Sequence, residues 1–480
     1  MQAIRIHPLD NVEVLLRARG DVPAGHKIAL RAIAKGEKVV KYGFPIGEAT
    51  VDIAAGEWVH VHNVRTLLDE NADYRYRPVA CPKVDVSDCS GLTFNGYPRA
   101  GGGVGIRNEI WIVPTVGCVN SVAMRLASEN QSLATGSVDG LYAFTHPYGC
   151  SQTGEDHART RKLLAAICRH PNAGGVLVLG LGCENLTAEQ FRDELGEVDG
   201  SRVRFLVCQE VDDELAEGSA LLREIADAMR FDARVPTPLS KLTVGMKCGG
   251  SDGLSGITAN PVVGRFSDLL VGLGGSTVLT EVPEMFGAEP ILFNRAASRE
   301  VFERAAKMVA DFKAYFTAHG ENVYENPSPG NKAGGITTLE DKSCGCVQKG
   351  GSAPVSDAIG YADPVRVPGL NMMSGPGNDL VSATALAASG SHLVLFTTGR
   401  GTPFGAPVPT VKMSTNTALF SRKRNWIDFN AGTVADGEET LDDAARRLFE
   451  YVVRVASGEA TRSEKNGARE IAIFKSGVTL

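Results

Sequence analysis

Residues 174–185, G-G-V-L-V-L-G-L-G-C-E-N, indicate the fold class of this chain. Their apolar run is short and continuous, which is typical of a strand buried on both faces. Helical patterns flank the run at 155–169 and 212–229. Comparable apolar runs lie at 110–116, 140–145, 203–208 and 242–246, and further helical patterns at 299–318 and 441–455. Strands that alternate with helices predict an α/β body with a largely parallel sheet.

The N-terminal residues follow a different pattern. Strand-like segments at 3–6, 12–16 and 38–42 are separated by glycines and prolines, with no convincing helical period. The predicted units are a small β-rich domain (1–65), a polar, proline-containing linker (66–100), an α/β domain (101–235) and a C-terminal α/β catalytic domain (236–480).

The composition excludes several classes of protein. The chain has 480 residues and a formal net charge of −7, without a long basic run, so we expect no nucleic-acid partner. No stretch of about 18 apolar residues would span a membrane, and the N-terminus lacks the apolar core of a signal peptide. We therefore expect a cytoplasmic protein whose ten cysteines are thiols, metal ligands or reactive groups rather than disulfides. The sequence leaves a homo-oligomer open.

Several predicted strands end in a turn that contains both glycine and cysteine. These turns are Gly117-Cys118, Gly149-Cys150, Gly182-Cys183 and Cys248-Gly249-Gly250. Ligands bind beyond the carboxyl ends of the strands in open α/β sheets, so the turns suggest one shared site. The alternative is that the cysteines are small buried apolar residues, the usual fate of a free cysteine.

Candidate metal ligands lie at the end of the β-rich domain. His60 and His62 stand two residues apart, and in a strand both imidazoles would point to the same face. The pair precedes the linker, and a cleft between domains is a common location for a site. Cys150 is a further candidate ligand. The alternative is a pair of surface histidines on an edge strand.

Candidates for proton transfer are His146, His157 and Lys247. The turn T-H-P-Y-G-C-S-Q, residues 145–152, places a histidine among several other polar side chains, and His157 follows on the next predicted helix. The alternatives are an ordinary capped turn at 145–152 and a solvated surface lysine at 247.

Candidates for substrate binding lie in three glycine-containing loops. A loop whose backbone amides hold a carboxylate fits Gly249, Gly250, Ser251 and Asp252, and the spacing is not that of a phosphate-binding loop. Lys332 and Arg400 are candidates for the positive charge that a substrate carboxylate needs. The alternative for Arg400 is a surface arginine on a loop.

Two further patterns allow more than one interpretation. Glu281 and Glu284 stand three residues apart after a predicted strand, so they could ligate a hard cation or transfer protons. Equally, they could stabilise the N-terminus of a following helix. Cys344 and Cys346 form a C-x-C pair, which without a second pair is a poor structural zinc site.

Several of these segments resemble a known family. The strings at 146–152, 169–185, 247–261, 326–340 and 395–405 resemble signature stretches of the altronate and galactarate dehydratases, in the same order. The opening domain, which ends in H-V-H-N, resembles the SAF-type module of that family. The resemblance extends from about residue 1 to the C-terminus.

The resemblance implies a divalent metal, Fe²⁺ or Mn²⁺, and a small-molecule sugar-acid substrate. The implied reaction is loss of water from an aldonate or aldarate, such as altronate or galactarate, to give a 2-keto-3-deoxy acid. The relatives include a sulfolactate sulfo-lyase, so the leaving group stays open. The sequence also permits an iron–sulfur hydro-lyase, although no compact cluster motif is visible, and a non-catalytic sugar-acid-binding protein.

Overall fold

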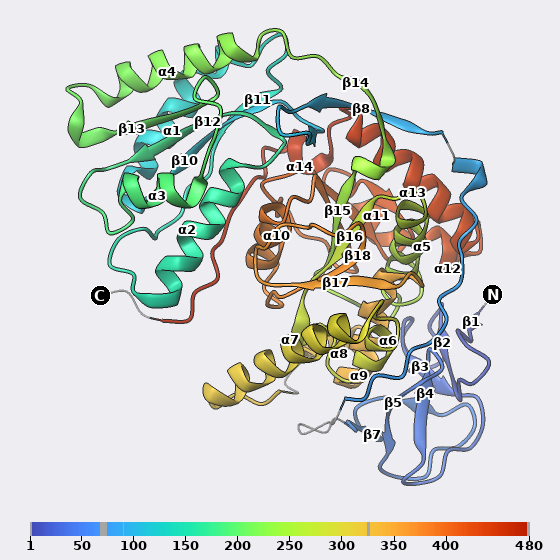
Figure 1. Cartoon of the computed structure of the whole chain (residues 1–480). Coiled ribbons are helices and arrows are strands. Elements are labelled where there is room, and N and C mark those ends of the chain that lie inside the picture. The colour runs from blue at the N-terminus through green and yellow to red at the C-terminus, as the bar shows by residue number, and fades with distance from the viewer. Residues whose placement is uncertain (1, 68–73, 90, 324–326, 478–480) are drawn as a thin grey trace.

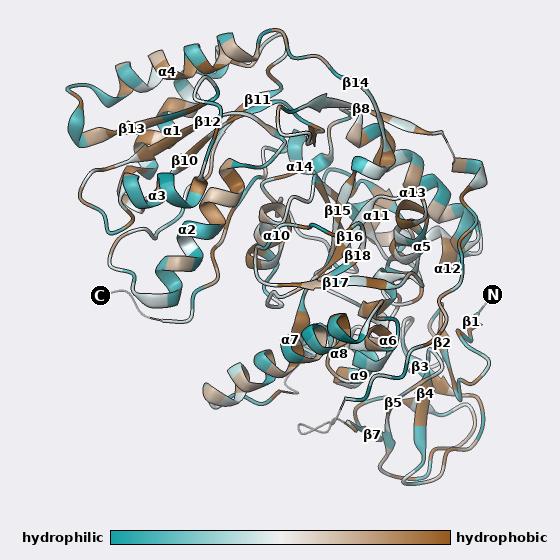
Figure 2. Cartoon of the chain, viewed as in Figure 1, coloured by the Kyte–Doolittle hydropathy of each residue, from teal (hydrophilic) through white to brown (hydrophobic). Residues whose placement is uncertain are grey.

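The computed structural model describes residues 2–67, 74–89, 91–323 and 327–477. These residues form a β-rich module at the N-terminus and two bodies in which helices pack on parallel strands (Figure 1). The predicted α/β class with a small N-terminal β-rich domain is confirmed. Apolar residues gather on the strands and on the inner faces of the helices, while hydrophilic residues cover much of the outside (Figure 2).

The N-terminal module contains two small antiparallel sheets. One has the order β1 (Ala3–Ile4), β2 (Val12–Leu15), β3 (Lys27–Ala29), β6 (Trp58–Val59), and the other β4 (Lys38–Lys41), β5 (Phe44–Ala49), β7 (Val64–Arg65). Both contribute to one apolar core that includes Val12, Val39 and Ile46.

The prediction of a strand through His60 and His62 is wrong. Strand β6 ends at Val59. The backbone amide of His60 donates to the Asn63 side chain at 2.9 Å, and the same side chain donates to the Trp58 carbonyl at 2.8 Å. Residues 60–63 therefore form a turn, because a side chain takes the backbone groups that a sheet would use.

The second unit has a four-stranded parallel sheet. Its order is β11 (Gly140–Ala143), β10 (Glu109–Pro114), β12 (Ala173–Gly180), β13 (Val203–Val207). Its helices are α1 (Asn120–Glu129), α2 (Gly154–Cys168), α3 (Ala188–Leu195) and α4 (Glu214–Met229).

The third unit is built on a seven-stranded parallel sheet. Its order is β17 (Val355–Ile359), β18 (Gly369–Met373), β16 (Ser276–Leu279), β15 (Thr243–Cys248), β19 (Leu393–Thr398), β20 (Thr410–Ser414), β21 (Phe429–Asn430). Its main helices are α5 (Ala259–Gly272), α7 (Arg299–Ala318), α9 (Leu339–Cys346), α10 (Asp379–Ala388) and α13 (Leu441–Ala456).

The predicted linker contains regular structure at its end. Strand β8 (Thr93–Pro98) pairs with β14 (Val235–Pro238) and β9 (Val104–Gly105). The three strands form a sheet of their own, separate from the parallel sheets of the two α/β units.

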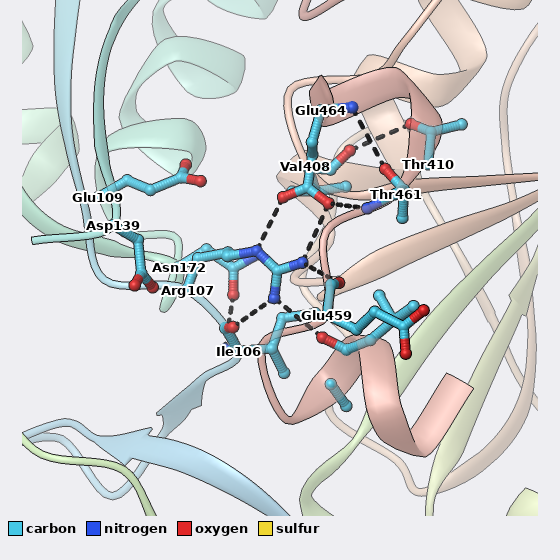
Figure 3. A network of polar contacts seen from close by, with 12 residues as sticks. Ile106, Arg107, Glu109, Asp139, Asn172, Val408, Thr410, Glu459, Thr461 and Glu464 are labelled. Carbon is cyan, nitrogen blue, oxygen red and sulfur yellow. Dashed lines mark hydrogen bonds and ion pairs between the residues drawn. The ribbon is translucent and has the colours of Figure 1, made fainter. Parts of the chain in front are cut away.

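Buried ion pairs and a shared core fix the two α/β units against each other. Arg107, which precedes β10, donates through Nε to Glu464 at 2.8 Å and through Nη2 to the Glu459 carbonyl at 2.9 Å (Figure 3). Its Nη1 donates to the Val455 carbonyl at 2.9 Å. Helix α2 packs against α10, and the cluster that includes Phe144 and Phe396 spans both sheets. Within the described part of the chain, no helix is long and apolar enough to cross a membrane.

Candidate metal and substrate site

A cavity of about 420 Å³ opens at the carboxyl edge of the seven-stranded sheet. Loops that follow β15 and β16 form its base, and residues of α7, α8 (Pro329–Ala333), α9 and α10 form its walls. This is the edge at which parallel α/β sheets bind ligands, because the strand ends and the following helix N-termini meet there.

Cys248, Glu284 and Cys346 meet beside the base of this cavity. The two sulfur atoms lie 3.6 Å apart, and the Glu284 carboxylate oxygen lies 2.9 Å from Cys248 Sγ and 3.1 Å from Cys346 Sγ. All three residues are buried, and one ligand atom of each lies within 4.8 Å of the others. Ligands of a single ion bound at about 2.0–2.3 Å lie roughly 3–4 Å apart, so this group has the spacing of a metal site with room for substrate.

Two lysines contact candidate ligands of this group. Lys349 Nζ lies 2.9 Å from Cys248 Sγ, and Lys342 Nζ lies 2.8 Å from the Glu284 carboxylate. Burial would raise the pKa of Glu284, but Lys342 and Lys349 hold it below its usual value. The hydrogen bond to Cys248 and burial raise the pKa of the Cys346 thiol. The thiol proton is therefore held in place unless a cation takes its position.

The formal charges of this cluster balance without an ion. The cluster contains three lysines, three carboxylates and two thiols: Lys247, Lys342, Lys349, Glu281, Glu284, Asp379, Cys248 and Cys346. Because the three ammonium groups match the three carboxylates, a divalent ion would keep the cluster neutral only by displacing both thiol protons.

The Glu281 carboxylate links the ends of strands β15 and β16. Its carboxylate accepts from Lys247 Nζ at 2.9 Å and from the Cys248 backbone amide at 2.9 Å. Glu281 has φ +70°, a left-handed conformation that is unfavourable for a side chain of this size. Such strain persists where surrounding contacts impose it, and here it directs the carboxylate back toward Cys248.

Lys247 lies behind the cavity rather than in it. It is fully buried, and its ammonium group bridges Glu281 and the Asp379 carboxylate, the latter at 2.7 Å. Asp379 does line the cavity and is 35% exposed. Gly249 leaves room for this arrangement, because a Cβ there would lie 2.7 Å from an Asp379 carboxylate oxygen. Lys247 therefore positions the Asp379 carboxylate at the cavity.

The N-terminal module supports the helix that carries Cys346. Asp341, on α9, accepts from Lys27 at 2.8 Å and from Lys41 at 3.1 Å, and all three side chains are almost completely buried. Burial lowers the pKa of Lys27 to about 8 despite the adjacent carboxylate. Removal of one partner would leave buried charge without compensation, so this contact fixes the module on α9.

The predicted substrate-binding loop lies partly in the cavity. Gly249, Gly250 and Ser251 line it. Asp252 instead accepts hydrogen bonds from Thr415 at 2.9 Å and Ser255 at 3.0 Å, which fixes the loop from behind.

The two predicted cations are exposed beside the cavity. Lys332 lies on the surface of α8. Arg400 donates to the Gly330 carbonyl at 2.7 Å, close to Gly250. The structure therefore places both near the site but not among the residues that line it.

The predicted metal ligands lie in two different units. His60 stacks on Trp58 with ring centroids 5.5 Å apart, and His62 contacts a different side of the same indole. Burial lowers the pKa of His60 to about 4. Cys150 packs in the core of the second unit, in the loop after β11. Among the described residues, the group with metal-ligand spacing is Cys248, Glu284 and Cys346, and it includes none of the predicted ligands.

The predicted proton-transfer histidines both lie in the second unit. His146 is buried, and its Nε2 contacts the Pro114 carbonyl at 2.8 Å. His157 is half-buried on α2. Neither lines the cavity, so Lys247 alone of these three candidates belongs to the site cluster.

The sequence carries a signal for two of the three residues in this group. Cys248 ends β15 and Glu284 follows β16, and these two neighbouring parallel strands bring them to the same edge, as the rule for strand ends requires. Cys346 lies at the end of a helix about a hundred residues further on, where a C-x-C pair gives no indication of its partners.

Comparison with known proteins identifies the family. A model of the D-galactarate/altronate dehydratase C-terminal domain matches residues 239–479. Models of the D-galactarate dehydratase/altronate hydrolase second domain and of the altronate/galactarate dehydratase SAF domain match 96–230 and 15–67. The chain belongs to the altronate/galactarate dehydratase family. It is an enzyme of the hydro-lyase class, as the resemblance implied.

Comparison with full-length relatives supports the same family assignment. The chain is 52% identical to altronate dehydratase of Bacillus subtilis, over 99% of both chains, and 51% identical to altronate dehydratase of Escherichia coli, over 100% of both. It is 33% identical to the galactarate dehydratase (L-threo-forming) of Escherichia coli, over 98% of this chain and 96% of that enzyme.

Proposed function

We propose that this enzyme removes water from an aldonate, with altronate as the first candidate, to give a 2-keto-3-deoxy acid. The observation that carries the proposal is the Cys248–Glu284–Cys346 group beside a cavity that Asp379 and Lys342 also line. The identity of 51–52% to altronate dehydratases over the full length supports the choice of altronate.

We propose a divalent metal at Cys248, Glu284 and Cys346. When bound there, the ion would supply positive charge to the substrate carboxylate as negative charge develops on it. Of the two metals that the family resemblance implies, two thiolates favour Fe²⁺ over Mn²⁺, because Mn²⁺ prefers oxygen ligands.

Asp379 and Lys342 have different roles in the proposed elimination. Asp379 presents a carboxylate to the cavity, held by Lys247 at 2.7 Å, and is placed to remove the proton next to the substrate carboxylate. Burial would lower the pKa of Lys342, but Glu284 holds it above the usual value. Lys342 is therefore a fixed cation that can hold the departing hydroxyl group by a hydrogen bond, rather than a strong proton donor. The backbone amide of Gly250 adds a donor for a substrate oxygen, whereas that of Gly249 donates to the Thr397 carbonyl at 3.0 Å.

The cavity matches an acid with one carboxylate better than an aldarate with two. Among the described residues that line it, Lys342 is the one basic side chain, and it lies at the metal end. Phe312, Phe316 and Val323 form an uncharged part of the lining. A second carboxylate there would lose water without gaining a cation, which is costly. This difference favours an aldonate. Elimination of sulfite from a sulfolactate-type substrate would use the same first step and remains the alternative.

Turnover of defined substrates tests the proposal. Purified protein is incubated with altronate, galactarate or sulfolactate and with Fe²⁺, Mn²⁺ or Mg²⁺, and 2-keto acid and sulfite are measured. We expect 2-keto acid from altronate with Fe²⁺ in preference to the other combinations. Release of sulfite alone, or no turnover of any sugar acid, would contradict the proposal.

A matched pair of variants links turnover to the ligands. Cys344 and Cys346 lie two residues apart on α9 and are both buried, but only Cys346 belongs to the ligand group. We expect Cys346→Ala to lose bound metal and at least a hundredfold in kcat, while Cys344→Ala retains both within about threefold. Equal behaviour of the two variants would remove Cys346 from the site.

A further inference from the structure

The last described residues form an extended segment, 468–477, that runs between the two α/β units (Figure 1). It is attached to the third unit at several points. The Glu470 amide donates to the Gly405 carbonyl at 2.9 Å, and the Ala472 amide donates to the Thr384 hydroxyl at 3.0 Å. Its far end runs beside α2 of the second unit, so the segment contacts both units.

Phe474 carries this segment into the substrate cavity. Its ring lines the cavity together with Phe312 and Tyr315 of α7. The Phe474 ring stacks on Phe312 with centroids 6.4 Å apart and lies 5.9 Å from the Tyr315 ring and 5.7 Å from the Tyr361 ring. The Phe474 amide donates to the Tyr361 hydroxyl at 3.1 Å, which fixes the backbone at this point.

The second unit holds the residues that follow Phe474. Asp156, in the first turn of α2, accepts from the backbone amides of Ser476 at 2.9 Å and Gly477 at 2.6 Å. Asp156 is only 6% exposed, so its carboxylate is committed to this segment rather than to solvent. Arg159, one turn later, donates to the Ser476 hydroxyl at 2.9 Å and lies 5.2 Å from the centre of the Phe474 ring.

We propose that Phe474 is a specificity-determining residue, and that Asp156 of the second unit is the residue that positions it. In this proposal the aromatic wall packs against the end of the substrate that does not meet the metal, and the aromatic side chains that form it carry no charge. An uncharged terminal hydroxymethyl group is accepted there and a second carboxylate is not. The second unit, which contributes none of the described residues that line the cavity, thereby acts on substrate choice. This inference rests on the proposed function and extends it to the substrate class.

The test compares kinetics of full-length, metal-loaded variants with an aldonate and with the aldarate of equal chain length. We expect Phe474→Ala to raise KM for altronate about tenfold and to change kcat by less than about threefold. The preference for altronate, measured as kcat/KM for altronate divided by kcat/KM for galactarate, should fall by at least fivefold. Phe474→Tyr should retain most of the discrimination. Asp156→Asn should shift KM and the ratio in the same direction by a smaller factor.

A surface variant and the wild type separate the outcomes. Glu189→Gln, at an exposed acidic residue on α3 of the same unit, should leave all constants unchanged. An unchanged ratio in Phe474→Ala, or an equal loss of kcat for both acids, would overturn the role of Phe474. An effect of Phe474→Ala without any effect of Asp156→Asn would overturn the role of the second unit. Wild-type protein that turns over no sugar acid would contradict the proposed function and this inference together.

Discussion

The buried ion cluster between the N-terminal module and α9 gives a quantitative prediction. In Asp341→Asn, the side chain keeps its shape and can still accept from Thr337, but Lys27 and Lys41 lose their shared counter-charge. Breaking a buried ion pair from one side costs about 3–5 kcal/mol. Since about 1.4 kcal/mol corresponds to a factor of ten, amide hydrogen exchange in α9 and β3 should accelerate by roughly a hundredfold or more. Metal affinity should fall with it, because α9 carries Cys346.

Hydrogen–deuterium exchange with mass spectrometry measures this effect directly on peptides that cover α9 and β3. The matched control is Asp311→Asn, which removes an exposed carboxylate paired with Lys307 on α7 and should change stability by less than about 0.5 kcal/mol. Exchange in Asp341→Asn within about threefold of wild type would refute the idea that the module holds α9 through this charge.

Three further predictions concern other groups. Asp379→Asn should lower kcat by about 10²–10⁴-fold with metal content unchanged, as checked by steady-state kinetics and metal analysis; lost metal would indicate a different role. Lys412 is fully buried, its Nζ has no hydrogen-bond partner in the described structure, and burial lowers its pKa to about 8. Lys412→Met should therefore raise the free energy of unfolding by roughly 1–3 kcal/mol, measured as a higher melting temperature. Burial lowers the pKa of His170 to about 3, below the 6.5 of an unperturbed histidine, so its contribution to stability is present above pH 6.5 and is lost as pH falls toward 3. The free energy of unfolding of His170→Gln, followed between pH 7 and 5, should therefore decline less steeply than that of wild type, with the difference in slope approaching about 1.4 kcal/mol per pH unit below pH 6.

Local sequence patterns predicted the elements of the fold well. Helix α7 occupies 299–318 as its apolar period indicated, and Ser298 caps it by accepting from the Val301 amide. The prediction of a strand through His60 and His62 was wrong, because it rested on spacing alone and Asn63 closes a turn there.

The site was only partly predictable, for a topological reason. The rule that ligands bind at strand ends selected Gly249 and Gly250, which line the cavity, and also Cys150, which does not. Both choices follow the same rule, but the loops belong to two different parallel sheets with two different carboxyl edges. A single sequence does not show which sheet a strand joins.

The remaining ligand depends on tertiary contacts. Cys346 reaches Cys248 because α9 packs beside β5 of the N-terminal module, where Lys27 and Lys41 meet Asp341. No local pattern around Cys346 reports a partner about a hundred residues earlier in the chain, so the C-x-C pair suggested at most a poor zinc site.

X-ray absorption spectroscopy of the Fe²⁺-loaded wild-type enzyme tests the central claim, that Cys248, Glu284 and Cys346 form the metal site. Two thiolate ligands predict two sulfur neighbours at about 2.3 Å, with oxygen or nitrogen completing the coordination shell. Cys346→Ala should show one sulfur neighbour and Cys344→Ala should show two. A wild-type spectrum that contains only oxygen and nitrogen neighbours would contradict the account.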